Sequence, residues 1–147
     1  MKWCGMDNKN IIFEHSVNLS IPFYDTDAMQ VVWHGNYLKY FEIARDGLFR
    51  EKGIDLYSFF DTHQYLFPII RSSVKFISPL RFRDEITCTA FLKDVRRKII
   101  MDFTIRRVPG RELCATGTTE QAAVSFKGEG MELEIPRELR FALGCRK

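Results

Sequence analysis

The feature that most constrains this chain is one long helical repeat that gives way to a two-residue repeat. We expect a helix over about residues 36–52, with Asn36 as its N-cap and Gly53 just beyond its end. Gly47 in its interior costs about 1 kcal/mol relative to alanine, which a backbone packed close against it would explain. The apolar face, recurring every three or four residues, consists of Tyr37, Tyr40, Phe41, Ala44, Gly47 and Leu48.

Strand-like alternation of apolar and polar residues surrounds this helix in the sequence. One strand is expected before it, and a short helix at 56–62 separates it from four more, two of them joined by a turn at Pro109-Gly110. Alternation of this kind indicates an antiparallel sheet with one covered face. We therefore predict an α+β fold, with an antiparallel sheet of five or more strands wrapped around one long central helix. The expected strands are 13–23, 65–78, 85–95, 98–108 and 113–126, and a helix starts in the tail at 135–139.

Length and composition limit what the chain can do. A chain of 147 residues fits a single domain, of which residues 1–10 are expected to be a flexible N-terminus. The net charge of +3 is too small to favour a nucleic-acid binder. No apolar run approaches the ~20 residues that span a bilayer, and no signal peptide is evident. The four cysteines form no C-x-x-C pair and the histidines are scattered, so we expect no metal site and a cytoplasmic protein with reduced thiols.

The most informative short motif is Asp25-Thr26-Asp27, followed by His34-Gly35-Asn36 at the start of the helix. Free backbone amides at a helix start favour developing negative charge and can stabilise an oxyanion. A nearby carboxylate can attack a carbonyl or activate a water molecule. From spacing alone, a turn stabilised by aspartate side chains is the simpler explanation, and a calcium loop is a weaker one because only two carboxylates are present.

Residues 24–42 and 73–82, and the strand that begins at Arg96-Arg97-Lys98, resemble hotdog-fold acyl-CoA thioesterases, closest to the YbgC-like and 4-hydroxybenzoyl-CoA thioesterase groups. The resemblance implies a hotdog fold and hydrolysis of an acyl-CoA thioester to a free acid and coenzyme A. It implies no cofactor, since coenzyme A is part of the substrate. It also implies a homodimer or homotetramer with active sites between subunits.

The resemblance also implies roles for individual residues. Asp27 matches the catalytic carboxylate, as nucleophile or as general base, and His34 stands at the amide that polarises the thioester carbonyl. Asn36 and Tyr37 match a structural pair. Gln30 stands where the family usually has glycine, so a positive φ there would strain the chain. Trp33 beside His34 mixes features of two branches and leaves the acyl group open, whether short, long or aromatic.

A basic cluster is formed by Arg96, Arg97 and Lys98. It suits the phosphates of coenzyme A, and the resemblance implies nucleotide contact at these positions, although a solvated hairpin end is an equally good explanation. Five aromatic residues could line an acyl channel, although packing in the core is the simpler role for each. They are Phe59, Phe60, Tyr65, Phe67 and Phe76.

Three functions remain open at this point. The first is an acyl-CoA thioesterase. The second is a thioesterase of the same fold that acts on an acyl carrier protein, in which case basic residues would meet an acidic protein. The third is a binding module that holds acyl-CoA without hydrolysing it; Asp27 argues against this and Gln30 keeps it open.

Overall fold

The computed structural model describes residues 10–128 and 130–145, so nearly all of the predicted flexible segment 1–10 lies outside the described residues. Three α-helices and eight strands follow one another along the described chain. In chain order they are β1 (Phe13–Ser20), a 3-10 turn η2 (Phe23–Asp25), α1 (Asn36–Glu51), α2 (Leu56–His63), β2 (Tyr65–Leu66), β3 (Ile69–Phe76), β4 (Glu85–Asp94), β5 (Ile99–Arg107), β6 (Glu112–Gln121), β7 (Val124–Ser125), β8 (Gly130–Met131) and α3 (Arg137–Ala142).

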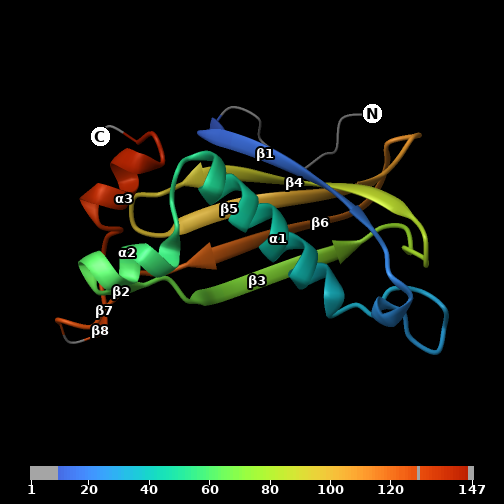
Figure 1. Ribbon diagram of the computed structural model, residues 1–147, viewed down its shortest axis with the longest axis horizontal. Coiled ribbons are helices and arrows are strands. Elements are labelled where there is room, and N and C mark those ends of the chain that lie inside the picture. The colour runs from blue at the N-terminus through green and yellow to red at the C-terminus, as the bar shows by residue number, and fades with distance from the viewer. Residues whose placement is uncertain (1–9, 129, 146–147) are drawn as a thin grey trace.

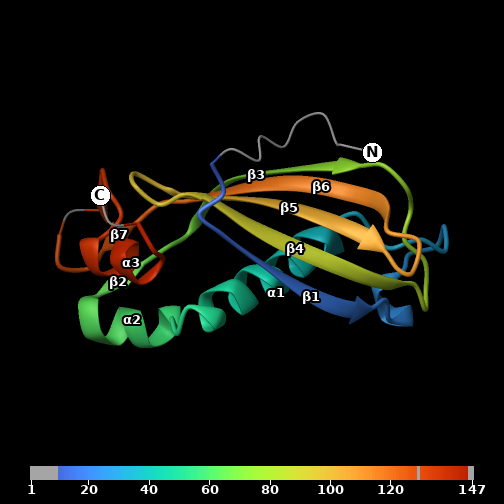
Figure 2. The same cartoon turned by 90° about the horizontal axis from the view of Figure 1, so that it is seen from above.

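Five of these strands form one antiparallel sheet in the order β1-β4-β5-β6-β3, with β1 and β3 at its edges. Helix α1 crosses one face of this sheet, as Figures 1 and 2 show. The sheet and the helix therefore form two layers with the core between them. This arrangement confirms the predicted α+β fold with one long central helix.

The core follows directly from the alternation in the sequence. In β4 the four residues that face α1, namely Ile86, Cys88, Ala90 and Leu92, are completely buried. From α1, Phe41 stacks on Phe103 of β5 with ring centroids 4.6 Å apart. Gly47 lies against β1, where an added Cβ would come within 2.9 Å of the His15 ring. This close packing is the reason for a glycine inside the helix.

Two predicted strands are each divided in the structure. The segment 65–78 breaks at Phe67-Pro68 into β2 and β3, because proline has no amide to donate to a ladder. The segment 113–126 breaks into β6 and β7. The short pieces β2 and β7 join β8, which the sequence analysis missed, in a separate three-stranded sheet beside α2. Within the described ranges, no helix is long and apolar enough to cross a membrane.

Candidate active site

A cavity of about 240 Å³ opens at the N-terminal end of α1. Asp27 and His34 both line it, so the structure brings together the two residues that the sequence singled out as catalytic. Much of the remaining wall is apolar. It includes Met29, Val31, Tyr37 and Phe76. The cavity therefore combines one carboxylate and one imidazole with a surface suited to an apolar group.

Asp27 is held by the loop that it begins. Its backbone amide donates to the carbonyl of Val31, and its carbonyl accepts from the amide of Gln30, each at 2.9 Å. Its carboxylate accepts the amide of Met29 on Oδ1 at 2.8 Å. No hydrogen bond from the described residues reaches Oδ2. One oxygen is thus fixed in place and the other is available for chemistry.

Gln30 adopts the left-handed conformation, with φ = 63°. A glycine would adopt this positive φ without cost. Gln30 has a Cβ and is therefore strained, as predicted from the sequence for a positive φ at this position. The cost for a residue with a Cβ is about 1 kcal/mol.

The start of α1 faces this loop with unused backbone donors. The N-cap is Gly35, and the prediction that Asn36 would cap the helix is wrong, because its side chain donates instead to the carbonyl of Asp25 at 2.8 Å. No described backbone carbonyl accepts from the amides of His34 and Gly35. These donors and the positive end of the helix dipole favour an oxyanion nearby. A Cβ at position 35 would overlap the Trp33 ring where it now lies, so glycine lets that half-exposed ring rest on the backbone.

Tyr37 and Phe76 form an aromatic corner of the cavity. The edge of one ring meets the face of the other, with centroids 4.9 Å apart. Burial is the largest influence on the Tyr37 hydroxyl and raises its pKa, so it stays neutral at physiological pH. Because Tyr37 is buried and Phe76 is about half exposed, the corner offers a substrate mainly the Phe76 ring, backed by an uncharged Tyr37.

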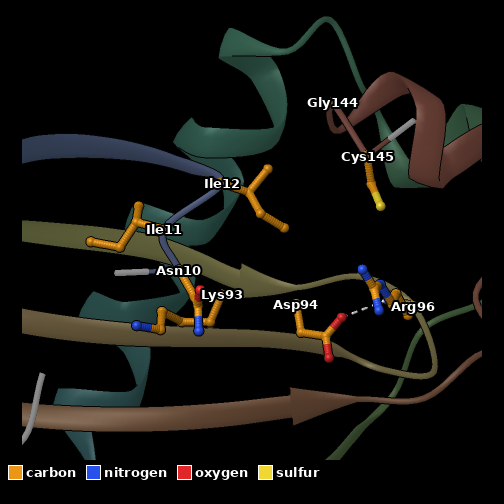
Figure 3. Close-up of a pocket in the computed structure, with 8 residues that line it drawn as sticks. All are labelled: Asn10, Ile11, Ile12, Lys93, Asp94, Arg96, Gly144 and Cys145. Atoms are coloured by element: carbon orange, nitrogen blue, oxygen red, sulfur yellow. Dashed lines mark hydrogen bonds between the residues drawn. The ribbon is translucent and has the colours of Figure 1, made fainter. Parts of the chain in front are cut away.

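The basic cluster lies at the other end of the molecule. Helix α1 has 16 residues and is about 24 Å long, and the hairpin of β4 and β5 lies beyond its C-terminal end (Figure 1). Arg96 lines a second cavity of about 650 Å³, where Figure 3 shows it beside Asp94, whose carboxylate accepts the Arg96 backbone amide. Lys98 is paired with Glu120 at 3.2 Å. A single chain therefore does not bring the basic cluster to Asp27.

Of the five aromatic candidates for an acyl channel, Phe76 is among the residues lining the Asp27 cavity. Phe59 and Tyr65 instead pack on Phe67 near α2, with ring centroids 5.7 and 6.4 Å apart. Sequence reasoning missed Met29 and Val31 as parts of the wall. Both belong to a loop, where no periodicity marks the side that faces a cavity.

Comparison with known proteins agrees with this architecture. Residues 21–143 match the thioesterase-like superfamily. A 1,4-dihydroxy-2-naphthoyl-CoA hydrolase of Nostoc punctiforme is 33% identical over 125 residues, covering 83% of this chain and 81% of that protein. A 1,4-dihydroxy-2-naphthoyl-CoA hydrolase of Rippkaea orientalis is 30% identical over 109 residues, covering 72% of this chain and 78% of that protein.

Solved structures show the same fold. A 1,4-dihydroxy-2-naphthoyl-CoA thioesterase from Synechocystis superposes with a TM-score of 0.79 at 16% identity, covering 89% of this chain and 96% of that chain. A hypothetical protein from Thermus thermophilus gives 0.76 at 25% identity, covering 88% and 96%. The family predicted from residues 24–42 is thus confirmed, and the chain belongs to the thioesterase-like superfamily.

Proposed function

We propose that this protein hydrolyses the thioester of an aromatic acyl-CoA to a carboxylic acid and free coenzyme A. Its family makes it a thioester hydrolase. The observation that carries the proposal is the position of Asp27 opposite a helix start with unused amides, in one small apolar cavity. Within this proposal, Asp27 and His34 are the catalytic-site residues.

In the proposed reaction the thioester carbonyl lies at the start of α1. The amides of His34 and Gly35 stabilise the negative charge that develops on its oxygen. The Asp27 carboxylate either attacks the carbonyl carbon or takes a proton from the water that attacks it. The carbon–sulfur bond then breaks, and coenzyme A leaves as a thiolate that takes up a proton. In the first route water hydrolyses the acyl–Asp27 anhydride.

The preference for an aromatic acyl group rests on two observations. The cavity wall offers the exposed Phe76 ring of the Tyr37–Phe76 corner, on which a flat ring can stack or meet edge to face. Relatives named as 1,4-dihydroxy-2-naphthoyl-CoA hydrolases act on a fused aromatic acyl group. A long aliphatic chain would need a deeper channel than a cavity of about 240 Å³.

We further propose that the active form is a homodimer joined along β3. This strand is an edge of the sheet, and all of its residues except Val74 are exposed. Its apolar side chains Ile69, Ile70 and Phe76 are each more than 40% exposed, which is unusual for an edge that stays unpaired. The other edge, β1, exposes polar residues instead. Antiparallel pairing of β3 with its copy would cover the apolar edge.

Such a dimer would also bring the basic hairpin of one subunit near Asp27 of the other, although the two lie far apart within one chain. A twofold axis across β3 reverses the direction of the partner, so the C-terminal end of its α1 comes to the side of Asp27. The partner's basic hairpin would then hold the phosphates of the coenzyme A whose thioester lies at Asp27. Arg96 and Arg97 are the exposed members, whereas Lys98 is occupied by Glu120.

A carrier protein remains the second candidate source of the acyl group, because the same basic hairpin would suit an acidic partner. Cys88 and Cys114 are free thiols, which supports the proposed cytoplasmic location. In the dimer proposed here the substrate is nevertheless a free acyl-CoA. Asp27 and Arg96 each line a cavity that can take part of a small molecule, whereas a carrier protein would need only an exposed surface.

The test is free-thiol release from short, long and aromatic acyl-CoAs, with an acyl carrier protein as a further substrate. We expect the fastest release from an aromatic acyl-CoA. Faster thiol release from the acyl carrier protein than from any acyl-CoA would show that a carrier protein, and not coenzyme A, delivers the acyl group. Tight binding of every acyl-CoA without thiol release would instead indicate the non-catalytic binding module.

A further inference from the structure

Asp25, the first acid of the motif, is a buried carboxylate to which the proposed mechanism gives no task. Only 3% of its surface is exposed. Its Oδ1 accepts from the amino group of Lys39 at 2.5 Å, and its Oδ2 accepts from the hydroxyl of Tyr40 at 2.7 Å. A buried charge is costly unless it is paired in this way, so a carboxylate kept here calls for a specific role.

The backbone of Asp25 makes further bonds to the same region. Its carbonyl accepts the amide of Trp33 at 3.0 Å and the side-chain amide of Asn36 at 2.8 Å. Side chain and carbonyl together thus tie this one residue to the segment that leads into α1 and to its first two turns. The start of α1 and the chain just before Asp27 cannot move independently.

The loop between these ties is closed on itself. An antiparallel bridge joins Thr26 to Val32, and the amide of Asp27 donates to the carbonyl of Val31 inside it. A loop of this kind moves as a unit. Its placement relative to the helix start therefore depends on the contacts that Asp25 makes.

We infer that Asp25, Lys39 and Tyr40 form a positioning cluster that sets the Asp27 carboxylate against the amides of the helix start. This inference rests on the catalytic role proposed for Asp27. Both partners contribute chemically, since Lys39 neutralises the buried charge and Tyr40 supplies an uncharged donor. Burial first, and then the hydrogen bond to Asp25, raise the pKa of the Tyr40 hydroxyl far above its usual range. The donor is thus retained wherever the protein is folded.

The test removes one contact of Asp25 at a time, first in the natural protein and then in the Asp27→Asn variant. Tyr40→Phe keeps the ring and deletes the hydroxyl. We expect kcat for the aromatic thioester to fall at least about tenfold with KM nearly unchanged, because a displacement of about 1 Å costs up to about a hundredfold. In the Asp27→Asn background, measured in single turnovers, the same change should have no further effect. Tyr57→Phe on α2 is the control, since that side chain is exposed.

Lys39 gives an independent readout. Lys39→Met should lower kcat in the same way, and Lys39→Arg, which can still pair with Asp25, should restore most of it. Equal losses from Tyr40→Phe in both backgrounds, or unchanged kcat with a lower melting temperature, would show a purely structural cluster and overturn the inference. Full turnover by Asp27→Asn alone would overturn the catalytic role of Asp27, and the inference with it.

Discussion

The two ends of α1 differ in how firmly they hold their functional groups. At the N-terminal end, Asp27 lies in a closed loop and its carboxylate is fixed by the Met29 amide at 2.8 Å. At the C-terminal end, Arg96 and Arg97 are exposed on a hairpin beside a wider cavity of about 650 Å³. The first end has a carboxylate held in a fixed position, as bond breaking needs, and the second has exposed charges that suit phosphates.

This contrast indicates a division of work between chains. Bond cleavage depends on positions fixed within about 0.5 Å, and the contacts that hold Asp27 all come from its own chain. Phosphate binding tolerates longer, flexible side chains, so it can be supplied across a subunit boundary. The comparison predicts that changes at the first end alter kcat, whereas changes at the second end alter KM.

The largest effect should come from Asp27→Asn. The amide has the size of the carboxylate but is neither a base nor a nucleophile, so kcat should fall by about 10²–10⁴-fold. Steady-state thiol release from the preferred aromatic acyl-CoA is the measurement, with Asp46→Asn on the exposed side of α1 as control. Full turnover by the Asp27→Asn enzyme would show that the Asp27 carboxylate takes no part in the reaction.

The next largest effect should follow from breaking the dimer, which takes the partner's basic hairpin away from Asp27. Ile70→Lys places a charge on the apolar edge of β3, and in an antiparallel dimer it would place two like charges near each other. We expect a monomer by sedimentation, because a charge buried in an apolar interface costs about 2 kcal/mol or more of dimerisation free energy. In the monomer kcat/KM should fall at least about tenfold, because the phosphates of coenzyme A lose their ion pairs with the partner's basic hairpin. Glu14→Lys on β1 is the control and should stay dimeric. A fully active monomer would show that one chain suffices.

The same contrast explains what could be predicted from sequence. The α1 face and the alternation in β4 and β5 are local patterns, so they could be predicted. Asp27 and His34 belong to one continuous motif, so their meeting in one cavity could be predicted too, whereas their catalytic role stays a prediction. Arg45 shows the limit. It lies on α1 among apolar residues and is buried, because its guanidinium donates to Thr119 at 2.9 Å, 74 residues away. No local pattern indicates such a partner, and none indicated that Asp27 and Arg96 lie at opposite ends.

A smaller effect is expected from the basic hairpin. Arg96→Ala with Arg97→Ala should raise KM for an acyl-CoA about tenfold and leave kcat nearly unchanged, since two exposed ion pairs of up to about 1 kcal/mol each are lost. The matching acyl-pantetheine, which lacks the nucleotide, should show no change in KM. Lys98→Met should do less because that side chain already pairs with Glu120. Equal effects on both substrates would mean that the hairpin contacts no phosphate.

The smallest effect concerns the backbone strain at Gln30, in the loop that carries Asp27. Gln30→Gly should relieve the positive φ of 63° and raise the free energy of unfolding by about 0.5–1 kcal/mol. The melting temperature should rise by about 3 °C. Arg111→Gly, at φ = 59° in the β5–β6 turn, should give a similar gain without touching the Asp27 cavity.

The two glycine variants should differ in kcat. Glycine at position 30 loosens the turn that carries Asp27, so we expect a fall of about twofold to fivefold at Gln30 and none at Arg111. Such a split would mean that the strained residue stiffens the loop at a small cost in stability. An unchanged kcat in Gln30→Gly would instead place the rigidity of this end wholly in the contacts of Asp25 with α1, where the double-variant comparison can measure it.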